Sequence, residues 1–289
     1  MKLAPSTYHD PVTISEATAL LAKLENARIL AGGQSLMPMM NFRLATPDHL
    51  VDINGITELA GIGCNGTELT IGAMTRQRDL EFSSEITARM PILQEALRNV
   101  GHRQTRNRGT IGGSLCHLDP SAELVNIVAL HEGALHITSA RGTRDTGLET
   151  FAVGTMTNSM QPDELLAAVT LTLWPRPHGY CFIETARRRG DFAIAAVGVL
   201  LTLAPDGGIA RTAITVSGLS ATPVRLAAVE AMTAGQRPCH ELFRAAAETA
   251  ATLEAMEDPY ATAAYRRHLA RILTYRAMQT ATKRAEDAA

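Results

Sequence analysis

The sequence predicts an α+β protein with two domains. Its 289 residues exceed the size of a typical single domain. Segments with the apolar spacing of helices and segments typical of strands occur in both halves, and in the second half strands come first and helices follow. Residues 175–179 hold two prolines and a glycine, which interrupt regular structure. We therefore expect one domain at residues 1–175 and a second at residues 176–289.

The first domain is expected to begin with a helix. Thr13-Ile14-Ser15-Glu16 is a capping-box pattern, and apolar residues follow at helical spacing as far as Leu24. Pro91 and Gly101 suit the start and the end of a second helix. A third helix is expected at residues 123–130, and residues 103–108 are expected to form a polar connection. Strands are expected at residues 27–30, 49–53, 68–71, 134–139 and 165–173.

The second domain is expected to be a small antiparallel sheet followed by helices. Strands are expected at residues 180–186, 192–203 and 209–218, and Pro205-Asp206-Gly207-Gly208 supplies a hairpin turn. Helices are expected at residues 222–235, 239–257 and 260–283, with the arginines of the last one, Arg266 included, on its solvated face. Residues 284–289 are expected to be disordered.

The composition argues against nucleic acids and membranes as partners. Hydrophobic residues make up 46% of the chain and the net charge is −2, so we expect a globular core without a basic surface. Aromatic residues, which could stack on bases, amount to only 4%. The longest apolar run, residues 192–204, is shorter than the roughly 20 residues that span a membrane, and residues 1–10 contain no apolar signal core. A cytoplasmic protein without membrane insertion is expected.

The cysteines do not form a metal-binding pattern. Cys64, Cys116, Cys181 and Cys239 are far apart, and none belongs to a Cys-x-x-Cys motif. We therefore expect neither a zinc ribbon nor an iron–sulfur cluster held by this chain. Scattered cysteines also fit a reducing compartment.

Two glycine-rich stretches give the clearest indication of a ligand. Residues 31–36 read Ala-Gly-Gly-Gln-Ser-Leu, and residues 109–114 read Gly-Thr-Ile-Gly-Gly-Ser. Glycine allows positive φ angles and close approach of a ligand to the main chain, and consecutive N–H groups form a concave anion site. Two such stretches indicate a ligand with two phosphates, or one large nucleotide held from both sides. Either stretch by itself is more typical of a simple turn.

Other motifs leave the chemistry open. The chain contains no P-loop, no dinucleotide fingerprint after a first strand, no nucleophile elbow and no His-Glu-x-x-His. Asp119 and Glu123, four residues apart, would either begin a helix or hydrogen-bond a ribose or a ring edge. The basic run at residues 187–189 is either a solvated strand edge or a contact to phosphate or to a partner subunit.

Short motifs along nearly the whole chain resemble one known family. They include the two glycine-rich stretches, with Pro38 after the first and Arg106-Asn107 before the second. Asp119-Pro120 and Arg188-Arg189-Gly190-Asp191-Phe192-Ala193 continue the pattern. In these motifs and their order, the chain resembles the medium, FAD-binding subunits of the molybdenum hydroxylases, the family of xanthine dehydrogenase, quinoline oxidoreductase and carbon monoxide dehydrogenase.

The resemblance implies a fold and a cofactor. The first domain would have the vanillyl-alcohol oxidase (PCMH) fold, with subdomains at about residues 1–55 and 56–175 and FAD between them, and the second domain would close over the isoalloxazine ring. The first glycine-rich stretch would wrap the pyrophosphate with its N–H groups and the second would approach from the other side, where any Cβ would hold the phosphate off. The residues expected to bind FAD are Gly32, Gly33, Gln34, Ser35, Leu36, Thr110, Gly112, Gly113, Ser114, Asp119, Glu123, Leu166 and Phe192.

The implied function is electron transfer. This subunit would take electrons from two [2Fe-2S] clusters of a small partner subunit, supplied by a large molybdopterin subunit, and pass them through FAD to an external electron acceptor. The implied assembly is a dimer of heterotrimers, and no catalytic residue or metal ligand is expected in this chain. Two alternatives stay open: a nucleotide-binding or scaffold subunit without redox activity, and a stand-alone flavin oxidase.

The sequence departs from the family's commonest pattern at three positions. Ser114 replaces an asparagine, Glu123 replaces an aspartate, and Glu184 stands where several members have a lysine near the flavin. A lysine near the ring would favour the anionic reduced flavin, and a glutamate would not.

Overall fold

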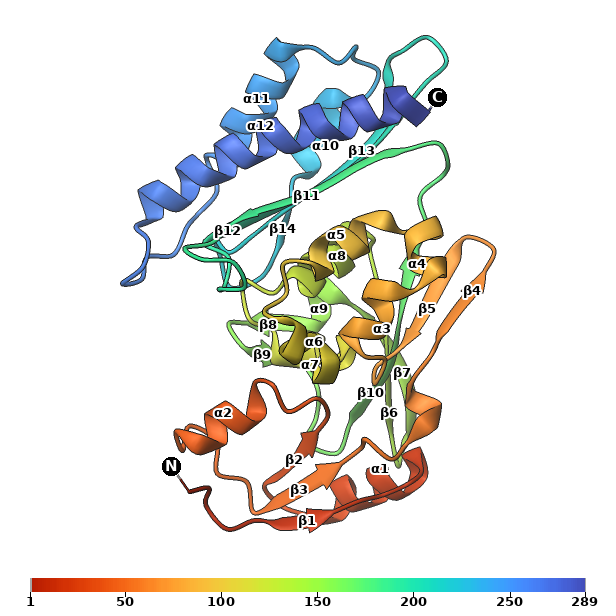
Figure 1. Ribbon diagram of the computed structural model, residues 1–289, viewed down its shortest axis with the longest axis vertical. Helices are drawn as coiled ribbons and strands as arrows, with labels where there is room; N and C mark the ends of the chain where they lie inside the picture. The colour runs from red at the N-terminus through yellow and green to blue at the C-terminus, as the bar shows by residue number, and fades with distance from the viewer. Residues whose placement is uncertain (1, 289) are drawn as a thin grey trace.

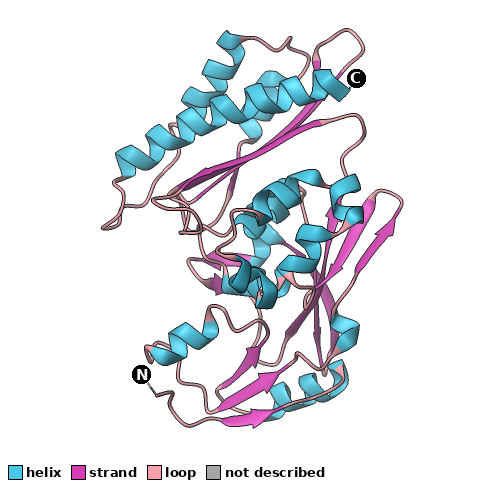
Figure 2. Cartoon of the chain, viewed as in Figure 1, coloured by secondary structure: helices cyan, strands magenta, loops and turns pink. Residues whose placement is uncertain are grey.

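The computed structural model of the protein describes residues 2–288 and arranges them in three tiers, each built on a β-sheet (Figures 1 and 2). The lowest tier is a parallel sheet with the strand order β1-β3-β2. Its elements are β1 (Thr7–His9), α1 (Ile14–Lys23), β2 (Ala27–Leu30), α2 (Leu36–Asn41) and β3 (His49–Asp52).

Helix α1 begins where the capping pattern predicts. Thr13 Oγ1 accepts a hydrogen bond from the N–H of Glu16 at 3.1 Å, and Glu16 Oε2 accepts one from the N–H of Val12 at 2.8 Å. The helix buries Ala17 and Leu21 in a small core shared with β3. One N–H group of the first helical turn and the N–H of Val12 before the cap are thus satisfied locally.

The middle tier is a five-stranded antiparallel sheet with the order β4-β5-β10-β6-β7, covered by helices. Its strands are β4 (Ile62–Asn65), β5 (Glu68–Gly72), β6 (Ala134–Ser139), β7 (Gly142–Gly147) and β10 (Leu165–Thr172), beside a small hairpin of β8 (Ala152–Gly154) and β9 (Thr157–Asn158). Its helices are η1 (Thr57–Leu59), α3 (Gln77–Phe82), α4 (Ser84–Arg89), α5 (Pro91–Leu97), α6 (Arg103–Arg108), α7 (Ile111–His117), α8 (Glu123–Leu130) and α9 (Leu148–Phe151).

Two predictions for the middle tier are wrong. Helix α5 ends at Leu97, before Gly101, and the expected polar connection at residues 103–108 is helix α6. Arg106 of α6 donates to Glu81 at 2.8 Å and to the carbonyl of Val100 at 2.9 Å. These tertiary contacts stabilise a polar helix that has no apolar face of its own to reveal it in the sequence.

The upper tier is a four-stranded antiparallel sheet, β11-β12-β13-β14, with α12 lying across one face (Figure 1). Its elements are β11 (Gly179–Thr185), β12 (Ala195–Leu203), β13 (Ile209–Ser217), β14 (Val224–Arg225), α10 (Ala227–Thr233), α11 (His240–Ala250) and α12 (Ala263–Ala288). The expected hairpin turn is present: Asp206 Oδ1 accepts from the N–H of Gly208 at 2.9 Å, and Gly207 has a φ of 82°. The α+β prediction is confirmed.

The predictions for the last helices need correction. Helix α10 begins at Ala227 rather than residue 222, and α11 ends at Ala250 rather than residue 257. Residues 284–288, expected to be disordered, continue α12, because Arg284 donates to the carbonyl of Tyr180 at 2.7 Å and to Glu95 at 2.6 Å. Residue 289 lies outside the described residues. Arg266, expected on a solvated face, is 3% exposed.

Polar contacts join the middle and upper tiers. The buried amide of Asn126 on α8 donates to Ser217 Oγ at 2.9 Å and accepts from Thr215 Oγ1 at 2.7 Å. Glu95 of α5 accepts from the N–H of Phe182 at 2.9 Å. Since a buried polar group is costly without its partner, these bonds fix how β11 and β13 lie on the middle tier.

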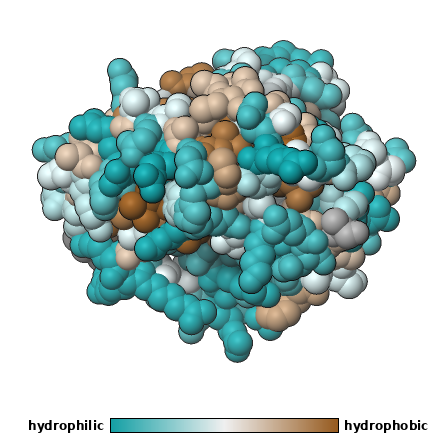
Figure 3. Space-filling view, turned by 90° about the horizontal axis from the view of Figure 1, so that it is seen from above, coloured by the Kyte–Doolittle hydropathy of each residue, from teal (hydrophilic) through white to brown (hydrophobic). Residues whose placement is uncertain are grey.

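Seen from above, the visible face of the molecule is mostly hydrophilic, with apolar atoms in separate patches (Figure 3). Among residues 2–288, every helix is too short or too polar to cross a membrane.

Protonation of His131, at the end of α8, is expected to destabilise the fold. His131 Nδ1 donates to the carbonyl of Thr172 at 2.8 Å, and burial lowers the pKa of the ring from 6.5 to about 4. The unfolded chain therefore binds a proton at higher pH than the folded chain does. The stability that His131 contributes is complete above about pH 6.5 and is lost as the pH falls toward about 4, with a total of about 3 kcal/mol.

Urea unfolding at pH 7 and pH 4.5 measures this effect. His131→Gln keeps a donor for Thr172 but cannot titrate, so it should lose less unfolding free energy between the two pH values than the wild type. Equal losses in both proteins would contradict the prediction.

Candidate functional site

One cavity of about 900 Å³ connects the three tiers. It is lined by residues that follow β2, by the segment from β5 to α8, by β10, and by residues 190–192 of the upper tier. All thirteen predicted site residues line it, although they come from positions as far apart as Gly32 and Phe192. The volume is at the upper end of the range for small-molecule and cofactor sites.

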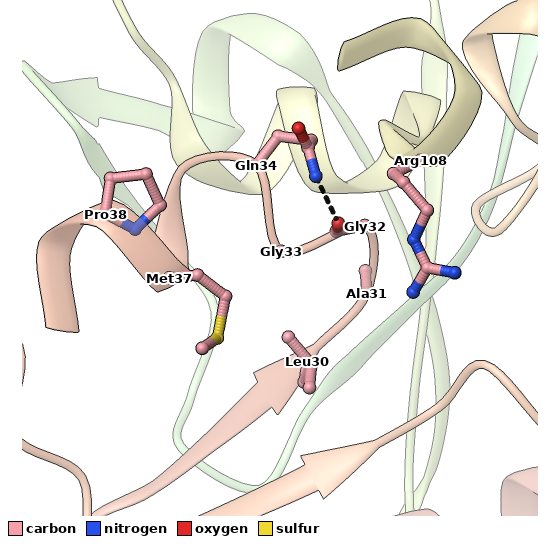
Figure 4. Close-up of a pocket in the computed structure, with 8 residues that line it drawn as sticks. All are labelled: Leu30, Ala31, Gly32, Gly33, Gln34, Met37, Pro38 and Arg108. Carbon is pink, nitrogen blue, oxygen red and sulfur yellow. Dashed lines mark hydrogen bonds between the residues drawn. The ribbon is translucent and has the colours of Figure 1, made fainter. Parts of the chain in front are cut away.

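The first glycine-rich stretch turns the chain from β2 into α2. Gly33 has a φ of 70°, which favours glycine, and Gln34 Nε2 donates back to the carbonyl of Gly32 at 3.0 Å (Figure 4). Within the described residues, no acceptor is present for the N–H groups of residues 32–36. A run of free N–H groups in a tight turn is a binding site for phosphate oxygens.

The second stretch is the start of helix α7 rather than a loop. Thr110 is its N-cap, and its Oγ1 accepts from the N–H of Gly113 at 3.0 Å. The N–H groups of Ile111 and Gly112 donate to the carbonyls of Thr75 and Ala73 at 3.3 and 2.9 Å. The two stretches are therefore unequal: the first offers a run of free N–H groups to a ligand, whereas most N–H groups of the second are bonded within the protein and it offers mainly its surface and the Ser114 hydroxyl.

The structure corrects the reason for two of the glycines. A Cβ on Gly32 would collide with the carbonyl of Arg108, and a Cβ on Gly112 would lie 2.5 Å from the Cβ of Ala73. At both glycines, an added Cβ would point into the protein rather than toward a phosphate. Gly32 and Gly112 are required because segments of the chain approach each other closely there.

A second, smaller cavity of about 350 Å³ lies against the first stretch (Figure 4). Leu30, Met37 and Pro38 form its apolar part, and Arg108 lines it from the side of α6. Because it shares residues 31–34 with the large cavity, we treat the two as one site.

Sequence reasoning missed the residues that support the first stretch. Asn54 Nδ2 donates to the carbonyl of Ala31 at 2.9 Å, and Arg76 donates to Asn54 Oδ1 at 2.5 Å and to the carbonyl of Arg108 at 2.6 Å. Arg76 thus links the two stretches. A lone asparagine after a strand and a lone arginine before a helix carry no local signal of this role.

Another part of the cavity wall joins two tiers and includes two large apolar residues, Leu166 and Phe192. Leu166 is buried on β10, while Phe192, a large aromatic residue, is 68% exposed at the rim. Ser121 Oγ donates to the carbonyl of Ala193 at 2.7 Å, which ties the Phe192 segment to the start of α8. Asp119 Oδ1 accepts from the N–H of Ser121 at 2.8 Å, so Asp119 stabilises a turn before α8 rather than capping the helix.

Two acidic side chains, those of Glu123 and Glu184, have raised pKa values. Burial, and next the charge of Glu184, raise the pKa of Glu123 to about 8. Burial raises the pKa of Glu184 to about 7. Glu123 lines the cavity, whereas Glu184, on β11, does not.

The sequence matches a known family over most of its length. Residues 3–174 match the family described as the FAD binding domain in molybdopterin dehydrogenase. The chain belongs to this FAD-binding family. Residues 180–281 match the C-terminal domain of carbon monoxide dehydrogenase flavoproteins. The protein is thus a flavoprotein subunit of the oxidoreductase class with FAD as its cofactor, as the resemblance implied.

Relatives within the family cover nearly the whole chain. The carbon monoxide dehydrogenase medium chain of Afipia carboxidovorans is 37% identical over 97% of this chain and 98% of its own length. Subunit alpha of the 6-hydroxypseudooxynicotine dehydrogenase complex of Paenarthrobacter nicotinovorans is 36% identical over 94% and 93%. The structure of carbon monoxide dehydrogenase from Hydrogenophaga pseudoflava superposes with a TM-score of 0.95 at 34% identity, covering 98% and 99% of the two chains.

Proposed function

We propose that this chain is the electron-transfer subunit of a molybdenum-containing hydroxylase complex. The observation that carries the proposal is the cavity itself, which gathers all thirteen predicted residues around a run of free N–H groups. Phosphate oxygens need such donors, and an isoalloxazine ring needs apolar walls such as Leu166 and Phe192.

Each part of the cavity has a separate task in this proposal. The N–H groups of residues 32–36 bind the pyrophosphate, and Arg76 and Asn54 keep that stretch in place. The surface of α7 at Thr110 and Gly113 covers the opposite side. Leu166 and Phe192 exclude water from the ring. FAD would supply the redox centre there.

The proposed partners follow from the relatives. Their names describe medium chains or subunits of dehydrogenase complexes. We propose a large molybdopterin subunit and a small subunit with two [2Fe-2S] clusters, assembled as a dimer of heterotrimers that delivers electrons to an external acceptor. All four cysteines of this chain are free, which supports a cytoplasmic location. The domain boundaries at residues 55 and 175 are part of the same proposal.

FAD binding by the isolated chain is the first expected result. Protein incubated with FAD and desalted should retain about one flavin per chain, with its absorbance and quenched fluorescence, because the cavity is preformed. It should not turn over substrates in air without partner chains. Failure to retain FAD would favour the scaffold alternative, and steady turnover by the isolated chain would favour the flavin oxidase.

A further inference from the structure

The side-chain amide of Gln77 lies at the wall of the large cavity without a hydrogen-bond partner. Gln77 is the first residue of α3, is 5% exposed and lines the cavity. Its Oε1 is buried and accepts no hydrogen bond. Of the residues in 2–288 that have a buried side-chain N or O atom without a partner, only Gln77 lines this cavity. Since buried polar groups are normally hydrogen-bonded, this amide indicates a ligand group that reaches it.

The main chain fixes the position of this amide over the second glycine-rich stretch. The N–H of Gln77 donates to the carbonyl of Gly109 at 2.9 Å, and Arg76 forms an isolated β-bridge with Thr110. A Cβ on Gly109 would lie 2.5 Å from Oε1 of Gln77, so the amide occupies the space that a side chain at residue 109 would take. The orientation of Gln77 is therefore set by the protein before any ligand binds.

The amide lies between the two parts of the cavity that the proposed function assigns. On one side, a Cβ on Gly32 would lie 2.9 Å from the Cα of Gly109, so the first glycine-rich stretch meets the residue that the amide covers. On the other side, α6 leads from Gly109 back to Gly101, whose carbonyl oxygen would lie 2.8 Å from a Cβ on Gly190 in the Phe192 segment. The amide is thus placed beside the part of the ligand between its phosphates and its ring.

The missing partner of Oε1 is a hydrogen-bond donor. The diphosphate of FAD carries no proton at neutral pH and only accepts hydrogen bonds, for which the free N–H groups of residues 32–36 are suited. The ribityl chain joins the phosphates to the ring, and its hydroxyl groups both donate and accept. A ribityl hydroxyl group therefore has the chemistry and the place that the amide requires.

We propose that Oε1 of Gln77 accepts a hydrogen bond from a ribityl hydroxyl group of bound FAD. This contact rests on the proposed function, which places the phosphates at residues 32–36 and the ring at Leu166 and Phe192. Without FAD the buried amide destabilises the protein, and with FAD it contributes to binding. The same side chain thus lowers the stability of the protein without FAD and raises its affinity for the cofactor.

The first experiment measures the thermal unfolding of the protein without FAD. Gln77→Met keeps the length of the side chain and removes both of its polar atoms. The melting temperature should rise by roughly 2 °C, because a buried amide without a partner is removed. An unchanged or lower melting temperature would show that the protein itself satisfies the amide, and it would overturn the proposal.

The second experiment compares the Kd values of FAD and ADP for the wild type and Gln77→Met. The Kd of FAD should rise about five- to tenfold in the variant, and the Kd of ADP should not change, because ADP has the two phosphates but no ribityl chain. Equal losses for FAD and ADP would place the amide at the phosphates or the ribose and overturn the ribityl contact. The flavin midpoint potential should be equal in both proteins. A shifted potential would place the amide at the ring and would overturn the contact as well.

Gln94→Met is the matched control, because Gln94 lies outside the cavity and its amide is satisfied. Its Nε2 donates to the carbonyl of Glu81 at 2.8 Å and to Thr87 Oγ1 at 3.1 Å. The same substitution should lower the melting temperature here and leave the Kd of FAD unchanged. A wild type that binds no FAD contradicts the proposed function together with the contact. A wild type that binds FAD no more tightly than Gln77→Met overturns the contact alone.

Discussion

Alanine at Gly32 or Gly112 is expected to abolish retention of FAD. At both positions the added methyl group meets atoms close to the main chain: the carbonyl of Arg108 beside Gly32, and the Cβ and carbonyl oxygen of Ala73, at 2.5 and 2.8 Å, beside Gly112. Such contacts require the backbone to move. Beside Gly32 this movement misplaces the free N–H groups, and beside Gly112 it displaces the start of α7 that lines the cavity, so FAD affinity should fall at least about 100-fold, or about 3 kcal/mol.

Gly33 provides a graded comparison. Its φ of 70° makes alanine unfavourable by roughly 1 kcal/mol, but the added Cβ meets only the flexible side chains of Leu30 and Met37, at 3.2 Å. Gly33→Ala should therefore weaken FAD binding by about tenfold or less. Gly147→Ala is the control, because nothing lies within 4 Å of its added Cβ.

The measurement is the flavin absorbance kept after desalting, together with Kd from fluorescence quenching. Circular dichroism checks that each variant is folded. A Gly32→Ala protein that binds FAD as tightly as the wild type would show that the close approach to Arg108 is not needed for the site.

All thirteen residues named from the sequence line the cavity, but the physical role of its glycines could not be predicted. Of the two glycine pairs, only Gly33 has a positive φ, and Gly112 and Gly113 lie in helix α7. What each glycine faces depends on a segment far away in the chain, as Gly32 and Arg108 illustrate. The two stretches also differ in how many N–H groups are free for a ligand. This difference depends on tertiary partners, because the carbonyls of Ala73 and Thr75 accept from N–H groups of the second stretch.

The helical periodicity of the sequence indicates that Arg266 is buried, although its charge suggests the opposite. Leu269, Leu273 and Ala277 are buried on α12, and Arg266 precedes them at the same three-to-four-residue spacing. The periodicity therefore places Arg266 on the buried face. The charge of Arg266 by itself favours the solvated face of α12. The periodicity is the better guide, because the loops packed against this part of α12 present carbonyl groups that accept hydrogen bonds from the guanidinium.

Replacing Arg266 by methionine is expected to cost about 3 kcal/mol of unfolding free energy. The guanidinium donates to the carbonyl of Ile194 at 2.7 Å, to that of Gly218 at 2.6 Å, and to Asp258. Methionine preserves much of the volume but leaves two buried carbonyls without donors, which is the main cost. Lysine keeps the charge but not the fork of donors, so Arg266→Lys should lose about 1–2 kcal/mol.

The same substitution should loosen the cavity, because Arg266 connects its walls. Gly218 donates its N–H to the carbonyl of Pro120 at 2.9 Å, and Ile194 is two residues beyond Phe192. Urea unfolding measures the stability and flavin fluorescence measures the exposure of the ring. Arg267→Met is the control, since Arg267 makes no described hydrogen bond. Equal stability in the two methionine variants would contradict the prediction, whereas a selective loss at Arg266, accompanied by brighter flavin fluorescence, would tie α12 to the cavity.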